Sequence, residues 1–147
     1  MPTAADFALA SRYLEDELLA LFLGQHPRDV VHSAATARWL EERGVDSEDL
    51  LVAALLHDVA KETQRRKDRV AWVLAGKVGL ARRLARSNSR FEMRRAMART
   101  ADHAESGARL LLAAGARAEV AELTRLHHRP PGGNRVLALL QQADAAN

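Results

Sequence analysis

The stretch LLVAALLHDVAK, residues 50–61, is strongly apolar and ends in three chemically active side chains, His57, Asp58 and Lys61. We predict a helix here, capped at its start by Ser47. Residues three and four apart on a helix are neighbours, so the three side chains can share one face. An imidazole nitrogen beside a carboxylate oxygen suits Zn, Fe, Mn, Co or Ni. Because a buried carboxylate is costly unless it is paired or binds a metal, the stretch predicts a metal-binding face. The alternative is a His-Asp pair at a helix end, where Lys61 only offsets the helix dipole.

Composition indicates an ordinary globular chain. Of its 147 residues, 48% are hydrophobic and 28% are charged, and this length favours a single domain over residues 1–147. No apolar run approaches the ~20 residues of a membrane span, and no signal stretch opens the chain. Because the chain has no cysteine, disulfides, thiolate nucleophiles and Cys-ligated metals are excluded. We therefore expect a cytoplasmic protein with no membrane partner.

Charge is distributed unevenly along the chain. Between Lys61 and Arg99, thirteen basic residues stand against three acidic ones, a net charge of +10, while the rest of the chain carries −7. A basic stretch after a candidate metal site indicates an anionic substrate drawn by the local field, and solvated arginine-rich helix faces are the alternative. Aromatic residues make up only 4%. Few side chains could therefore stack on bases, which argues against a nucleic-acid partner.

Helical signals recur throughout the chain, and no window shows the alternation of a strand. Thr3 with Asp6 is a capping signature for a helix that ends at Gly24. Pro27 opens a second helix that runs to about Arg43. Further helices are predicted for residues 71–85, 91–115, 118–128 and 134–144. Together with the central stretch, they predict an all-α bundle of about six to seven helices.

Histidines gather on the apolar side of the predicted helices. Five of the six lie on such a face or just past it: His32, His57, His103, His127 and His128. The sixth, His26, stands beside Pro27 in a turn and looks incidental. Each histidine alone could be an ordinary core or surface residue. Five of them, with Asp58 and Asp144, would converge only around something that holds them. Helical bundles build metal sites in this way, from ligands that project inward from several helices.

The order His32, His57-Asp58 and Asp144 resembles the signature of the HD-domain metal-dependent phosphohydrolase superfamily. The flanking sequences RDVVHSAATARWL, ALLHDVAK, HAESGARLLLAAGA and LLQQADAAN also match. The resemblance covers about residues 28–144. It implies an HD-domain helical bundle in which these four residues hold a first divalent ion.

The additional histidines resemble the ligands of the dinuclear subgroup, which includes the HD-GYP cyclic-dinucleotide phosphodiesterases. By this resemblance Asp58 would bridge two ions, and His103, His127 and His128 would hold the second. RPPGGN follows the histidine pair in place of the GYP element, which argues against cleavage of cyclic di-GMP. The symmetrical dinucleoside tetraphosphate hydrolases of the superfamily are closer in size and have a similar HAxxGA-like stretch and terminal ADxxx. The second histidine of the pair is not their usual residue.

The resemblance implies a metal-dependent phosphohydrolase that acts on a nucleotide or another small phosphate ester, with metal-activated water as the nucleophile. Its cofactors would be one or two divalent ions (Fe, Mn, Co, Ni, Zn or Mg). Asp58 and Lys61 are the candidate catalytic residues, and Lys61, Arg28 and Arg129 are the candidate phosphate-binding cations. Solvated surface positions are the alternative for all three cations. Two other functions stay open: a di-iron oxygenase of the same superfamily, and a nucleotide-binding regulator without turnover. A homodimer is compatible with the sequence.

Overall fold

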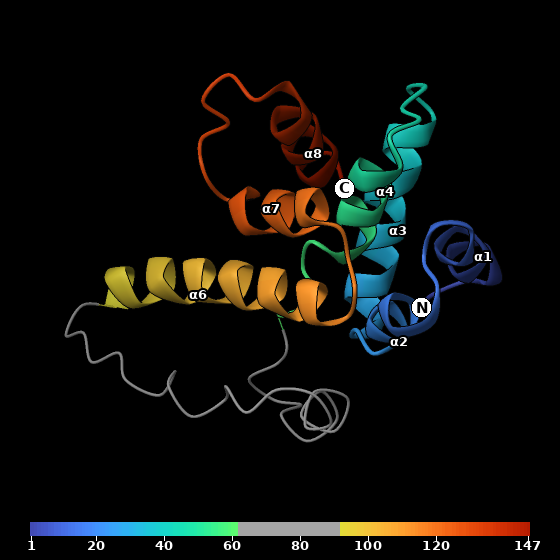
Figure 1. Ribbon diagram of the computed structural model, residues 1–147, viewed down its shortest axis with the longest axis horizontal. Coiled ribbons are helices and arrows are strands. Elements are labelled where there is room, and N and C mark those ends of the chain that lie inside the picture. The colour runs from blue at the N-terminus through green and yellow to red at the C-terminus, as the bar shows by residue number, and fades with distance from the viewer. Residues whose placement is uncertain (62–91) are drawn as a thin grey trace.

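The computed structural model describes residues 1–61 and 92–147, and these residues form seven helices and no strand (Figure 1). The helices are α1 (Ala4–Tyr13), α2 (Asp16–Leu23), α3 (Pro27–Glu41), α4 (Glu48–Leu56), α6 (Glu92–Ala113), α7 (Ala118–Leu126) and α8 (Arg135–Ala145). The predicted all-α class is confirmed for this part of the chain. The helix predicted for residues 71–85, and most of the basic stretch that precedes Arg99, lie outside the described residues.

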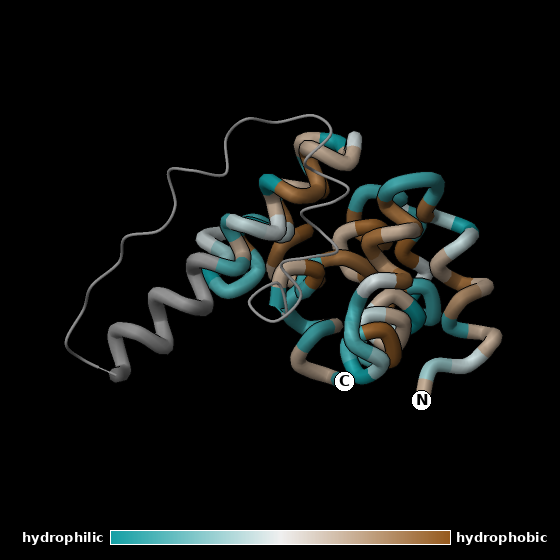
Figure 2. Tube along the Cα trace, turned by 90° about the horizontal axis from the view of Figure 1, so that it is seen from below, coloured by the Kyte–Doolittle hydropathy of each residue, from teal (hydrophilic) through white to brown (hydrophobic). Residues whose placement is uncertain are grey.

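The helix α4 is the centre of the bundle. It packs against α1, α2, α3, α7 and α8, and every residue from Leu50 to Leu56 is buried. A helix that is apolar on all sides belongs in a core, where each fully buried Leu or Val contributes about 1.5–3 kcal/mol. Figure 2 shows hydrophobic segments gathered where the helices meet. As predicted, Ser47 caps the start of α4, and its hydroxyl oxygen accepts a hydrogen bond from the backbone N–H of Leu50.

The N-terminal segment forms two helices where the sequence predicted one. The first helix, α1, ends at Tyr13, because Leu14 and the residue after it are extended. A straight helix over residues 4–23 would span about 30 Å. The break turns the chain back onto the bundle, so that Leu14 and Phe22 are both buried. The prediction of one continuous helix up to Gly24 was therefore wrong.

Asp6 both caps α1 and joins it to α3. Its Oδ2 accepts a hydrogen bond from the backbone N–H of Thr3 at 2.7 Å, and the Thr3 hydroxyl accepts one from the N–H of Asp6 at 3.3 Å. The other carboxylate oxygen accepts a hydrogen bond from Nη2 of Arg38 at 2.5 Å. Burial alone raises the pKa of Asp6, but the hydrogen bonds from Thr3 and the charge of Arg38 outweigh burial and hold this pKa below its usual value.

The helices α6 and α7 form a second wall of the bundle, with α7 folded back along α6 (Figure 1). Their close approach depends on Gly107 of α6. A Cβ at this position would lie 3.3 Å from Cγ2 of Thr124 on α7 and 3.6 Å from Cβ of Ala60. Because Ala60 lies two residues after Asp58, this glycine lets α6 pack against the turn that carries Asp58.

Two helices stop where the candidate ligands begin. The central helix α4 ends at Leu56, although the sequence predicted a helix through Lys61, and His57 is its C-cap. Residues 57–61 form turns, in which the N–H of Lys61 donates to the carbonyl of Asp58 at 2.8 Å. Similarly, α7 ends at Leu126, two residues before its predicted end.

Among the described residues, no helix is long and apolar enough to cross a membrane.

Candidate metal centre

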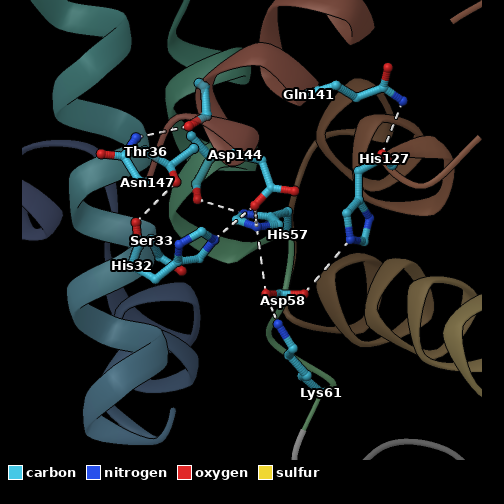
Figure 3. Close-up of polar contacts among 12 residues, drawn as sticks. His32, Ser33, Thr36, His57, Asp58, Lys61, His127, Gln141, Asp144 and Asn147 are labelled. Atoms are coloured by element: carbon cyan, nitrogen blue, oxygen red, sulfur yellow. Dashed lines mark hydrogen bonds and ion pairs between the residues drawn. The ribbon is translucent and has the colours of Figure 1, made fainter.

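Four helices bring the predicted ligands to one place (Figure 3). The contributions are His32 from α3, His57 and Asp58 from the end of α4, His127 from the end of α7, and Asp144 from the last turn of α8. His32 and Asp144 are 112 positions apart, yet their side chains are in direct contact. The bundle therefore gathers side chains from both ends of the chain around the end of its central helix.

Asp144 lies between two imidazoles. Its Oδ1 is 2.8 Å from Nε2 of His32, in a hydrogen bond, and 3.2 Å from Nε2 of His57. The contacts with these two histidines hold the pKa of Asp144 well below its usual value, against the opposing effect of burial. The helix that carries it is capped as predicted, since Oδ1 of Asn134 accepts from the N–H of Leu137 at 3.0 Å.

His57 and His127 share one local geometry. Each is the C-cap of its helix, and each Nδ1 donates to the backbone carbonyl three residues earlier, Ala54 at 2.9 Å and Thr124 at 2.5 Å. The last carbonyls of a helix lack intrahelical partners, so these bonds satisfy the helix ends. They also place a proton on Nδ1. Nε2 is then the nitrogen available to a metal, and second-shell bonds of this kind orient metal-ligating histidines.

Asp58 is placed between these two histidines. Its Oδ2 is 3.7 Å from Nε2 of His57 and accepts a hydrogen bond from Nζ of Lys61 at 2.8 Å, while its Oδ1 is 3.7 Å from Nε2 of His127. Burial raises the pKa of Asp58, but His127, His57 and Lys61 outweigh burial, so this pKa falls well below its usual value. The carboxylate is therefore ionised, with one oxygen facing each histidine.

The donor set contains side chains that could hold a metal ion. Three candidate ligand atoms are buried without a hydrogen-bond partner: Nε2 of His57, Oδ1 of Asp58 and Nε2 of His127. Buried polar groups left unpaired are rare and cost about 1–3 kcal/mol each. In the part of the chain that the structure describes, two groups have all their ligand atoms within 4.8 Å of one another: His32, His57 and Asp58, and Asp58, His127 and His128. Asp58 belongs to both groups.

His128 and His103 lie at the outer side of the second group. The ring of His128 is 3.7 Å from that of His127 and 5.8 Å from that of His103, measured between centroids. His128 is exposed at the surface, and desolvation of its ring, together with the charge of His127, lowers the pKa of His128 to about 4. Its ring is therefore neutral at pH 7, as a metal ligand must be. His103 belongs to neither close group, and its role as a ligand stays a prediction.

The predicted cations are placed differently from one another. Lys61 is paired with Asp58, although half of its side chain is exposed. Burial lowers the pKa of Lys61, but the charge of Asp58 outweighs burial and raises it, with smaller contributions from Asp29 and Asp144. The side chains of Arg28 and Arg129 are exposed. Phosphate binding by these three cations stays a prediction.

Two glutamines that the sequence did not single out contact the backbone beside the candidate ligands. Nε2 of Gln141 donates to the carbonyls of His127 at 3.0 Å and Arg129 at 2.6 Å. Nε2 of the buried Gln25 donates to the carbonyl of Leu55, next to the end of α4, at 3.1 Å. For Gln141 a signal did exist, because it precedes Asp144 by three residues on one helix and so shares its face. For Gln25 no local pattern indicated the contact.

Comparison with known proteins gives a family assignment. Residues 23–146 match the family model described as HD domain. This segment contains every candidate metal ligand, from His32 to Asp144. No curated protein and no solved structure matches the chain.

Proposed function

Because this chain belongs to the HD domain family, whose members are mostly metal-dependent hydrolases, we propose that it hydrolyses a small phosphate ester, most readily a nucleotide, with the help of two divalent cations. The observation that carries the proposal is the position of Asp58. It is buried and ionised, and it turns one oxygen toward His57 and the other toward His127. A carboxylate placed in this way is suited to bridge two ions.

The side chains divide into two half-sites around Asp58. His32, His57 and Asp144 would hold the first ion with Oδ2 of Asp58. His127 and His128 would hold the second ion with Oδ1 of Asp58, and we assign His103 to the same half-site. The buried Nε2 atoms of the two helix-capping histidines, which make no hydrogen bond, support this division. Their Nδ1 protons are already donated to backbone carbonyls, so metal binding through Nε2 would require no tautomer change at His57 or His127.

Bound divalent cations would supply an activated water molecule and neutralise charge on the phosphate. The chain's own residues favour an anionic substrate, because neutral imidazoles and only two carboxylates leave the loaded centre positive. With His127 and His57, Lys61 keeps Asp58 ionised, and its half-exposed ammonium group could also contact a phosphate oxygen. The burial of His57, Asp58 and His127 shields the inner side of the centre from water and so strengthens its electrostatic interactions.

The test is phosphate release from a panel of nucleotides, dinucleoside polyphosphates and simple phosphate esters by protein stripped of metal. We expect no activity without metal, recovery with a divalent cation, and loss in Asp58→Asn and His127→Ala. His26→Ala is the matched control, because His26 caps α3 and belongs to neither group of close ligand atoms, and it should keep full activity. Phosphate release that survives chelation and both substitutions would contradict the proposal. Dioxygen uptake without phosphate release would do so as well.

A further inference from the structure

The side chain of Gln141 on α8 hydrogen-bonds to the turn that follows α7. Its single Nε2 donates one hydrogen bond to the carbonyl of His127 and a second to that of Arg129. Both N–H groups of the amide are therefore used on a three-residue segment that contains His127 and His128. Figure 3 shows the bond to His127.

This turn has few other backbone bonds. The N–H of Arg129 donates to the carbonyl of Leu126 at 2.7 Å, but the next two residues, Pro130 and Pro131, have no N–H to donate. The turn must therefore be held by donors from elsewhere. Gln141 supplies them from the helix that also carries Asp144, three residues further on, so one face of α8 contacts both halves of the metal centre.

We propose that Gln141 is a positioning residue of the metal centre. Through its two hydrogen bonds it fixes the His127–His128 turn relative to Asp144, and so sets the geometry of the second half-site against the first. The inference rests on the proposed two-ion function. Removing a contact that orients a metal ligand typically changes metal affinity by about 10–100-fold. Here the affinity for the second ion should change.

The experiment compares three variants of the full chain during Co²⁺ titration of metal-stripped protein, followed by calorimetry and by the visible absorption of bound Co²⁺. Gln141→Leu removes both donors at similar size, and Gln141→Lys keeps donors of similar reach. Gln142→Leu is the matched control, because Gln142 is the exposed neighbour of the same type. We expect Gln141→Leu to weaken the second ion by about 10–100-fold with the first ion little changed. Gln141→Lys should recover much of this loss, and the control should titrate as wild type.

Each other outcome overturns the inference. If wild type binds two ions and Gln141→Leu binds both as tightly, Gln141 has no positioning role, while the proposed two-ion centre stands. If Gln141→Leu weakens both ions equally and Gln141→Lys recovers neither, the residue is merely structural. If wild type itself takes up fewer than two ions, the proposed centre fails, and the inference fails with it.

A second measurement covers the case in which Gln141→Leu does not fold. In ¹H–¹⁵N spectra of the wild-type protein titrated with Zn²⁺, the side-chain amide of Gln141 should shift with the second equivalent and move less with the first. A Gln141 amide signal that the second equivalent leaves unmoved would overturn the inference.

Discussion

Replacing Asp58 by Asn should abolish metal binding while the chain still folds. The amide keeps the shape of the side chain but removes its charge and one good ligand oxygen. In the metal-free protein the variant should lose some stability at neutral pH, because the contacts of Asp58 with His127, His57 and Lys61 outweigh the burial of its carboxylate. The lost partner, Lys61, is half exposed and can turn to solvent, and exposed ion pairs contribute about 0–1 kcal/mol.

The metal-dependent stability of the wild type sets the size of the effect. A divalent ion present at about 100 times its Kd stabilises the native state by about 2.7 kcal/mol. For a chain of about 150 residues each kcal/mol shifts the Tm by about 2–4 °C, so one bound ion should raise the Tm by about 5–11 °C. Without the Asp58 charge, two cations would face each other with only His ligands and Asp144 to hold them. The shift should therefore vanish in Asp58→Asn.

The assay is thermal unfolding of wild type and Asp58→Asn, with chelator and with a series of Mn²⁺ concentrations. We expect a folded variant with a lower Tm than wild type in chelator, and a metal-dependent rise in Tm in wild type alone. His26→Ala should rise with the wild type. A variant that gains as much stability from metal as the wild type would refute the bridging role of Asp58, and a variant already unfolded in chelator would show that its charge serves the fold.

Three further predictions follow from individual contacts. His127→Ala should bind one Mn²⁺ per chain, because it removes a buried ligand of the second half-site only; calorimetric saturation at two ions would contradict this. For Asp6 the folded pKa lies below the unfolded value of about 3.9, so its stabilising contribution is present above that value and is lost as the pH falls through the folded pKa. Urea unfolding should accordingly show Asp6→Asn less stable than wild type at pH 7, with a gap that narrows in acid, and a gap that widened would be inconsistent with the assigned contacts. Gly107→Val should lower the free energy of unfolding by about 1–3 kcal/mol through overpacking against Thr124. The exposed neighbour variant Ser106→Val is its control, and equal losses in the two would disprove the close-packing explanation.

Local chemistry made part of the fold predictable. Ser47 and Asn134 stand directly before apolar helical runs, and both cap the helix that follows. Such caps are decided within one turn, so the sequence carries the information. The apolar run before His57 likewise predicted a buried central helix. The residues that converge on it could be named because metal ligands are restricted to a few residue types in a recognisable order.

Long-range packing decided what the sequence did not indicate. Neither Gly nor Pro marks the break after Tyr13, and Leu14 keeps the helical spacing of its neighbours, yet in the bundle Leu14 is extended and buried. The end of α4 before His57 is equally unmarked. Bonds such as that of Arg38 with Asp6, or those of Gln141 with the His127 turn, join residues from different helices. Their pairing exists only once the bundle has formed.

The central claim is that Asp58 bridges two divalent ions, and anomalous scattering from crystals grown with Mn²⁺ tests it most directly. The account predicts two anomalous peaks, one on each side of the Asp58 carboxylate. One peak should lie among His32, His57 and Asp144, and the other beside His127 and His128. A single peak remote from Asp58, or no peak with the carboxylate still paired to Lys61 at saturating Mn²⁺, would contradict it.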